Sequence, residues 1–208
     1  MTQPMAVRFP RRTATKARTR QRIQNAARRL FVELGYADAT LAAIADAADV
    51  HVTTLFTHFA SKQDLMTSIA VSAGERFEAH VAAQRAAGVP ALAFWRSEVT
   101  QAAQAYERNT EGQLKLGRAM SEHPELLPAW ITLQLRLIAL LADYIAVQLP
   151  TDRPDDARAQ MAAAMLVAGG LMAFETWLAG GRAGDLVREN LRLIDAAELI
   201  LKAGLGID

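Results

Sequence analysis

The stretch from Thr40 to Phe59, TLAAIADAADVHVTTLFTHF, restricts the fold more than any other part of this chain. Its first half repeats apolar residues at helical spacing: Leu41, Ile44, Ala45 and Ala48. This spacing predicts a short helix with one apolar face, and Thr40 is placed to cap its N-terminus. Asp49 and Val50 then break the pattern, where Asp tolerates the left-handed backbone of a tight turn.

A second short helix is predicted to begin at His51. Four of its side chains can point to the core: Val52, Leu55, Phe56 and Phe59. The opposite face is polar and lacks carboxylates, with Thr53, Thr54, Thr57 and His58. Helices of this length are not stable alone in water, so the pair is predicted to pack as a helix-turn-helix whose second helix enters a DNA groove.

Basic residues are concentrated near the N-terminus, although the formal net charge is only +1. They precede the first acidic residue, Glu33, and comprise Arg8, Arg11, Arg12, Lys16, Arg18, Arg20, Arg22, Arg28 and Arg29. Such a block indicates binding to a polyanion. Residues 1–15 lack helical periodicity and are predicted to form a disordered basic arm, which either adds salt-dependent DNA contacts or only aids solubility.

Helices are predicted on both sides of the helix-turn-helix. The preceding helix has apolar residues at Ile23, Ala26, Ala27, Leu30, Phe31 and Leu34, and Gly35 is its left-handed C-cap. Ser61 and Asp64 form a capping-box-like pair for the next helix, which extends from Lys62 to about Ala87. Lys62 is either a solvated surface charge or, beside a DNA-reading helix, a phosphate contact.

The rest of the chain also favours helices, because hydrophobic residues make up 51% of the sequence and aromatic residues only 6%. Further helices are predicted at about Ala91–Arg108, Gln113–Met120, Trp130–Gln148, Asp155–Ala179 and Asp185–Lys202. The fold class is therefore all-α, with about nine helices. The expected organisation is a basic arm at 1–15, a helix-turn-helix domain at 16–66 and a helical regulatory and dimerisation domain at 67–208.

The last two helices carry small residues and more apolar surface than one partner helix covers. Such a pair suggests a four-helix interface between two copies, although the same helices can instead close the core of one copy. One recognition helix contacts too few bases to be specific. A homodimer on a palindromic operator, with half-sites ~34–36 Å apart, is therefore expected.

Large, soft side chains between these elements are candidates for binding an apolar effector, although an aromatic or Met side chain at helical spacing normally belongs to the core. Gly169 and Gly170 lie mid-helix, which indicates close approach by a helix or a ligand. The candidate effector-binding residues are Phe77, His80, Trp95, Val99, Tyr106, Leu116, Met120, Trp130, Leu133, Leu137, Met165, Gly169, Met172 and Phe174.

Enzymatic chemistry has little support in the sequence. The chain has no cysteine, and its four histidines show no metal-ligand spacing. It also lacks a Gly-rich phosphate loop and a nucleophile elbow. We therefore expect no enzyme activity, cofactor or metal. Since no apolar segment near the N-terminus predicts a leader or a membrane span, a cytoplasmic protein without a membrane partner is expected, located on the nucleoid when bound to DNA.

The segment from Arg22 to Leu65 closely resembles the DNA-binding domain of the TetR family of bacterial transcriptional regulators. The resemblance lies in the AA-x-x-LF-x-E-x-GY run, the IA-x-x-A pair, the TL-aromatic-x-HF core and the SK-x-x-L helix entry. Three positions differ from the family pattern. Asp49 replaces Gly at the turn, His51 replaces the capping Ser, and Phe56 replaces a common Tyr whose hydroxyl can reach a phosphate.

The C-terminal half resembles a subgroup of this family more loosely. The segments EHPELLPAW and AGGLMAFETWLAGG are similar to those of mycofactocin-regulator-type members, some of which respond to acyl-CoA. This resemblance implies an acyl chain or acyl-CoA as effector.

Three functions are compared. The first is a dimeric, ligand-responsive repressor that binds double-stranded DNA and is released by a small apolar effector. Its DNA-binding residues are Arg18, Arg20, Thr40, His51, Val52, Thr53, Thr54, Phe56, Thr57, His58 and Lys62. The second is an architectural DNA-binding protein without an effector. The third is a small-molecule-processing enzyme with an incidental helix-turn-helix, in which His80 would be needed for turnover.

Overall fold

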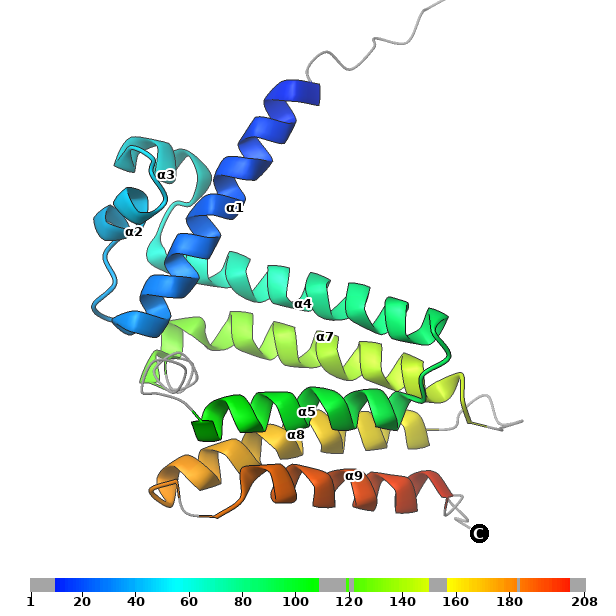
Figure 1. Cartoon of the computed structure of the whole chain (residues 1–208). Helices are drawn as coiled ribbons and strands as arrows, with labels where there is room; N and C mark the ends of the chain where they lie inside the picture. The colour runs from blue at the N-terminus through cyan, green and yellow to red at the C-terminus, as the bar shows by residue number, and fades with distance from the viewer. Residues whose placement is uncertain (1–9, 109–118, 120–121, 150–156, 183, 203–208) are drawn as a thin grey trace, which may run out of the picture. The chain divides into compact units, whose positions relative to one another are not determined.

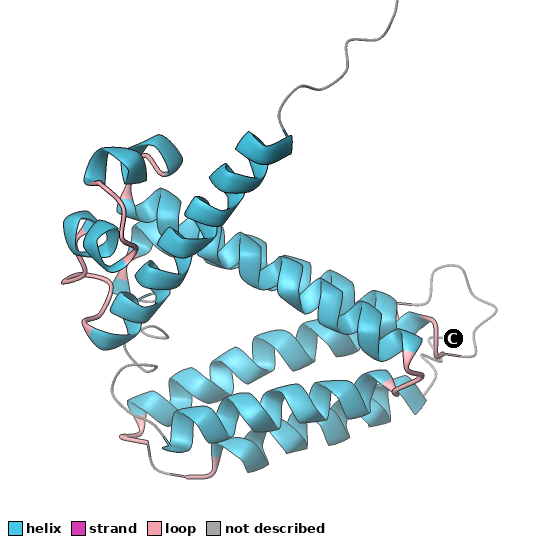
Figure 2. Ribbon diagram, turned by 45° about the horizontal axis from the view of Figure 1, so that its top comes forward, coloured by secondary structure: helices cyan, strands magenta, loops and turns pink. Residues whose placement is uncertain are grey.

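The computed structural model describes residues 10–108, 119, 122–149, 157–182 and 184–202. In these residues the chain is all-α, with eight α-helices and no strand (Figure 2). The helices are α1 (Pro10–Glu33), α2 (Leu41–Ala47), α3 (Val52–His58), α4 (Lys62–Ala86), α5 (Ala91–Arg108), η1 (Pro124–Leu126, a 3₁₀ turn), α7 (Leu127–Ala146), α8 (Arg158–Ala179) and α9 (Leu186–Lys202). Of the helix expected at Gln113–Met120, only Ala119 lies within the described residues.

The chain divides into two compact units. The N-terminal unit comprises Met1–Ile69 and Glu111–Leu126, and the C-terminal unit comprises Ala70–Thr110 and Leu127–Asp208. This division differs from the expected domains, which placed everything after residue 66 in the regulatory domain. Ala119 and Leu126 belong to the N-terminal core, because both side chains are buried among residues of α1 to α4.

Helix α1 begins at Pro10, earlier than expected. Residues 10–15 are therefore helical, whereas the sequence analysis assigned them to a disordered arm. Proline is well tolerated in the first turn of a helix, because its missing N–H would have no intrahelical partner there. Residues 1–9 of the expected arm lie outside the described residues.

The N-terminal core forms where the apolar faces of α1 to α4 meet. It contains Ile23, Ala26, Ala27, Phe31, Tyr36, Ala39, Ile44, Ala45, Ala48, Leu55, Phe59, Leu65, Met66, Ile69, Ala119 and Leu126. Two residues at its corners have left-handed backbones, Gly35 with φ of 93° and Asp49 with φ of 50°. Both turn predictions are thus confirmed, since these residue types tolerate positive φ.

The second segment of the N-terminal unit packs beside the loop that follows α1. The ring of His123 lies 4.8 Å from that of Tyr36, edge to face, and the Gln63 side chain donates a hydrogen bond of 2.7 Å to the carbonyl of Glu125. Burial, and then the charge of Glu125, raises the pKa of Tyr36. The HPEL sequence is therefore part of the core that supports the helix-turn-helix.

Phe56 does not point to the core as expected, because 52% of its surface is exposed. Leu55 and Phe59, four residues apart, occupy the buried face of α3, and Val52 packs partly against the same core. Phe56 follows Leu55 by one residue, so it lies about 100° around the helix and faces solvent.

The C-terminal unit contains four helices that close on one another. α5 packs on α7, α7 on α8, α8 on α9 and α9 on α5, and Figure 1 shows these helices side by side. The core of this unit, to which α4 adds Val81, consists of Val81, Ala91, Phe94, Trp95, Leu141, Ala142, Tyr144, Ile145, Ala159, Ala162, Ala163, Leu166, Val167, Ile194 and Ala197. The inner faces of α8 and α9 therefore close the core of a single chain.

Gly169 and Gly170 allow α9 to approach α8 closely. A Cβ atom on Gly169 would lie 3.0 Å from a methyl carbon of Leu193, and one on Gly170 would lie 3.0 Å from the amide oxygen of Asn190. Asn190 is buried and donates a hydrogen bond to the carbonyl of Leu186. The structural reason for these glycines is thus a neighbouring helix of the same chain.

Two segments, Pro124–Ala146 and Arg158–Ala179, are long and apolar enough to span a membrane by length and composition. Both segments supply buried residues to the cores described above.

Candidate nucleic-acid interface and effector site

The helix-turn-helix is held by side-chain caps at the start of both short helices. The hydroxyl oxygen of Thr40 accepts a hydrogen bond of 3.1 Å from the backbone N–H of Ala43, as predicted for the N-cap of α2. His51 caps α3, where its Nδ1 accepts a hydrogen bond of 3.4 Å from the N–H of Thr53. An imidazole nitrogen therefore performs the capping task of the Ser that the family pattern has here.

The exposed face of α3 has hydroxyl groups that already bond within the protein. The hydroxyl of Thr53 lies 2.8 Å from Nδ1 of His51, and the hydroxyl of Thr57 donates a hydrogen bond of 2.6 Å to the carbonyl of Thr54. Thr53, Phe56 and Thr57 are exposed, whereas Thr54 is half-buried. The candidate base-contacting surface thus consists of uncharged side chains, and the hydroxyls of Thr53 and Thr57 have partners within the protein.

Arg20 closes the C-terminal end of α3. Its Nη1 donates a hydrogen bond of 2.8 Å to the carbonyl of His58, and its guanidinium lies 4.2 Å above the ring of Phe59. A cation at a helix C-terminus also complements the helix dipole. The structure therefore gives Arg20 a contact with the recognition helix that sequence reasoning did not predict.

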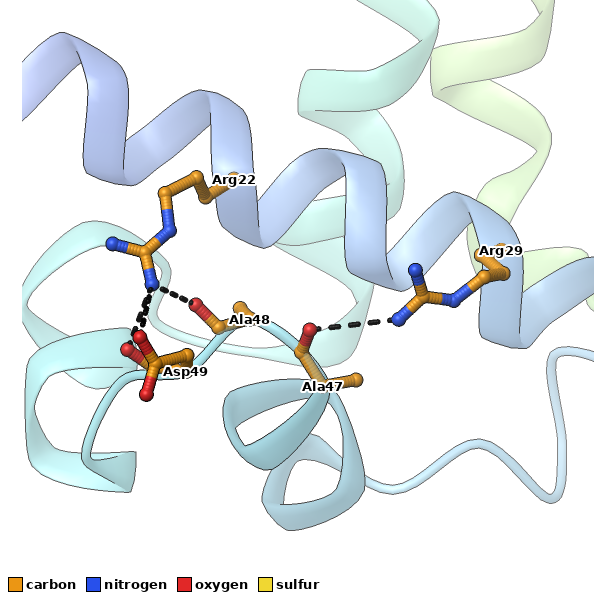
Figure 3. A network of polar contacts seen from close by, with 5 residues as sticks. All are labelled: Arg22, Arg29, Ala47, Ala48 and Asp49. Atoms are coloured by element: carbon orange, nitrogen blue, oxygen red, sulfur yellow. Dashed lines mark hydrogen bonds and ion pairs between the residues drawn. The ribbon is translucent and has the colours of Figure 1, made fainter.

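Helix α2 is closed in the same way by arginines of α1, as Figure 3 shows. Nη2 of Arg22 donates to the carbonyls of Ala48 and Asp49 at 2.6 and 2.9 Å, and it lies 3.0 Å from the Asp49 carboxylate. Arg29 makes a longer contact of 3.5 Å with the carbonyl of Ala47. These basic residues thus satisfy carbonyls that a two-turn helix leaves without intrahelical partners.

Lys62 has a structural contact where a phosphate contact was predicted. Its ammonium donates hydrogen bonds of 2.7 and 2.9 Å to the carbonyls of Tyr36 and Ala37, and it lies 4.6 Å from the centre of the Tyr36 ring. The ammonium therefore fixes the loop after α1. The predicted capping pair is present next to it, since Ser61 accepts from the N–H of Asp64 and Asp64 accepts from the N–H of Ala60.

His58, expected to contact DNA, is half-buried at the end of α3. Burial lowers its pKa, and the charges of Lys16 and Arg20 lower it further. The imidazole therefore stays neutral at pH 7 and adds no positive charge for a phosphate. Lys16 and Arg18 are exposed on α1, so their charges remain available to the solvent side of the N-terminal unit.

In the C-terminal unit, several candidate effector residues form aromatic contacts. The ring of Phe77 lies 5.8 Å from that of Phe94 and 6.2 Å from that of Trp95. A second pair consists of Tyr106 and Phe174, 4.5 Å apart, and burial raises the pKa of Tyr106. Half-buried candidates in the same unit are Val99, Trp130, Leu133, Leu137 and Met165. Of the candidates, Trp95 belongs to the core of this unit, and Phe77, Val99, Leu137 and Met165 pack against it.

Other candidates do not fit an interior site. Met172 is 70% exposed, and His80 is an exposed residue whose Nδ1 lies 3.5 Å from the Glu98 carboxylate. Met172 faces solvent, whereas the ring of His80 lies 5.1 Å from that of Phe94, edge to face, at the border of the core. The space beside Gly169 is filled by the side chain of Leu193, as described above. Leu116 and Met120 lie outside the described residues.

Two polar atoms in the C-terminal unit were missed by sequence reasoning. Among the described residues, the buried side-chain oxygen of Gln134 on α7 and the buried indole nitrogen of Trp177 on α8 have no hydrogen-bond partner. Buried polar groups are normally paired, because leaving them unpaired costs ~1–3 kcal/mol. Trp177 also lines a hollow of about 600 Å³ with Glu107, Arg182 and Asp185. Only the tertiary structure shows these atoms to be buried.

Comparison with known proteins places this architecture in a family. The model for bacterial regulatory proteins of the tetR family matches residues 23–69. The transcriptional regulator TcmR of Streptomyces glaucescens, a helix-turn-helix protein, is 28% identical over 165 residues, which are 77% of this chain and 73% of TcmR.

Two solved structures share the fold. FadR of Thermus thermophilus, a TetR-family repressor in complex with lauroyl-CoA, is 20% identical, with a TM-score of 0.62 over 91% of this chain and 96% of that one. FadR of Bacillus subtilis in complex with stearoyl-CoA is 16% identical, with a TM-score of 0.55 over 88% of this chain and 97% of that one. Residues 23–69 of this chain therefore form a DNA-binding domain of the tetR family of bacterial regulatory proteins, and this match identifies a DNA-binding transcriptional regulator, not an enzyme.

Proposed function

We propose that this protein is an effector-responsive repressor that binds a two-half-site operator as a homodimer. The observation that carries this proposal is the exposed, uncharged face of α3. The opposite face of α3 packs on the core of the N-terminal unit, and side chains cap the N-termini of both short helices. A helix presented in this way suits the major groove, where base edges can be distinguished.

The outer face of α8 supports dimerisation. Its exposed residues include Met161, Ala168, Met172 and Thr176, and none of them is charged. Met161 and Met172 are 47% and 70% exposed, and Leu199 of α9 is 68% exposed. Large exposed apolar side chains on one face favour association with a second copy. The inner faces of α8 and α9 pack in the core of a single chain, so we propose that the dimer interface uses their outer faces.

The effector site is proposed to lie among the helices of the C-terminal unit. Aromatic and aliphatic side chains suit an apolar chain, and the unpaired atoms of Gln134 and Trp177 suit a polar head group with a donor and an acceptor. The two FadR structures contain lauroyl-CoA and stearoyl-CoA. An acyl-CoA has both an apolar chain and a polar head group, so it is the proposed class of effector.

Effector binding releases DNA only if it favours a different state of the protein. Helix α4 is continuous from Lys62 to Ala86, and it belongs to both units, since the division falls after Ile69. A change in the C-terminal part of α4 is therefore proposed to move its N-terminal part, which follows α3 directly.

A DNA titration tests the repressor proposal. Purified protein should prefer the region upstream of its own gene over random DNA, with affinity that falls as salt rises. Arg18→Ala should reduce the salt slope by about one, as expected for a lost phosphate contact. Arg20→Ala is the matched control, because Arg20 bonds to His58 and should weaken binding with little change of slope. Equal affinity for all sequences would contradict the proposal and favour an architectural protein.

A thermal-shift and release assay tests the effector. Lauroyl-CoA should raise the midpoint of thermal unfolding and release bound operator, whereas free CoA serves as the control for the head group alone. Substituting Gln134 by Leu should reduce the response to acyl-CoA without reducing DNA affinity. If no acyl-CoA shifts the midpoint or releases DNA, the acyl-CoA class is wrong, even where sequence-specific DNA binding persists.

A further inference from the structure

We propose that the ring of Phe56 contacts the C5-methyl group of a thymine in each operator half-site, and that this contact is the main source of base discrimination by α3. The inference rests on the proposed DNA-binding function and names the base that this helix recognises.

The residue types on α3 exclude most kinds of direct base contact. Guanine is recognised by Arg or Lys, adenine by Asn or Gln, and cytosine by Asp or Glu. The helix Val52–His58 has the sequence VTTLFTH and contains none of these residues. Threonine can still approach several bases. The remaining base-specific group in the major groove is the thymine methyl, which is recognised by apolar contact.

The threonines of α3 have limited capacity for donor contacts. The hydroxyl of Thr57 donates to the carbonyl of Thr54, and that of Thr53 is paired with Nδ1 of His51. The hydroxyl proton of Thr57 is therefore engaged within the helix, the hydroxyl of Thr53 is paired with the cap residue, and Thr54 is half-buried. A bidentate contact with a purine would require breaking these bonds.

Phe56 has the geometry that an apolar contact requires. It is 52% exposed, and it lies on α3 between the exposed residues Thr53 and Thr57. Leu55 and Phe59 hold the opposite face of the helix in the core, and Arg20 closes its C-terminus. The ring is thus supported by a fixed helix, while about half of its surface can still be buried by a ligand.

Uracil substitution tests the contact, because replacing thymine by uracil removes only the methyl group. An operator is first selected from random duplex DNA with the wild-type protein, and each thymine is then replaced in turn by uracil. Loss of one buried methyl group should weaken binding about fourfold at one thymine of each half-site. At the same position, Phe56→Ala should bind the thymine and uracil operators equally.

Two further variants separate this contact from general effects. Phe56→Tyr keeps the ring and should keep the sensitivity to uracil. Leu34→Ala removes another exposed apolar side chain of the N-terminal unit, 44% exposed and outside α3, and should also keep it.

The inference is overturned if no uracil substitution weakens wild-type binding, or if Phe56→Ala retains the full sensitivity. A wild-type protein that enriches no sequence at all would instead overturn the repressor proposal, and the thymine contact with it.

Discussion

Both units of this protein have an apolar core, but the 7-residue helices α2 and α3 belong to the N-terminal unit. The C-terminal ends of these two helices bond to arginines of α1, Arg22 at α2 and Arg20 at α3. In the C-terminal unit, long helices pack through apolar and small side chains, and Gly169 lets Leu193 approach α8.

Helix length determines how large a share of the backbone depends on such contacts at the helix ends. Each α-helix leaves four N–H groups and four carbonyls without intrahelical partners. In the 7-residue helices α2 and α3 these end groups are most of the backbone, whereas in the 22-residue helix α8 they are a minority. Short helices that must present one face to a ligand therefore depend strongly on caps from neighbouring elements.

The largest expected effect comes from removing a buried apolar side chain of the C-terminal unit. Leu166 is 1% exposed, so Leu166→Ala should lower the free energy of unfolding by about 2–5 kcal/mol, measured by urea denaturation. Val147→Ala is the control, since Val147 is 64% exposed and should change stability by less than about 0.5 kcal/mol. Similar small changes for both variants would contradict packing as the dominant interaction in this unit.

A smaller effect is expected from removing a cap in the N-terminal unit. Arg22→Ala should lower stability by roughly 1 kcal/mol, because it loses charged hydrogen bonds that are partly exposed to solvent. Amide hydrogen exchange of α2 should accelerate most. Arg29→Ala is the matched control, since Arg29 makes only one long contact of 3.5 Å with the same helix end. If both variants behave alike, Arg22 is a surface charge and not a cap.

The smallest effect concerns pH. The pKa of His58 is lowered from 6.5 by burial and by the charges of Lys16 and Arg20. Below pH 6.5 the unfolded chain therefore binds more protons at this site than the folded one, so stability should fall as the pH drops through this region. Urea denaturation at pH 7.5 and 5.5 should show a larger loss for the wild type than for His58→Gln. A variant with an unchanged pH dependence would mean that His58 is less buried, and less affected by Lys16 and Arg20, than the structure shows.

Local patterns were sufficient to predict most of the helix-turn-helix. The apolar spacing, the cap at Thr40 and the corners at Gly35 and Asp49 agree with the structure, because each depends on residues close in sequence. The prediction that Phe56 points to the core was wrong, because helical spacing alone places this residue only at an edge of the buried face of α3. Only packing of Leu55 and Phe59 against α1 settles which edge is covered.

The roles of the basic residues depended on tertiary structure. Charge and position made Arg20 and Lys62 candidates for phosphate contact, but their partners are 38 and 26 residues away along the chain. The same applies to the buried atoms of Gln134 and Trp177, whose burial depends on neighbouring helices.

The amino-acid sequence by itself determined that this protein is all-α and that α2 and α3 form a helix-turn-helix, because helix formation and capping are encoded within a few turns. Only the tertiary structure decided which cations close helix ends, which face of α3 remains exposed, and that residues 119 and 122–126 support the N-terminal core. The physical reason is that burial and long-range hydrogen bonds exist only after distant segments meet.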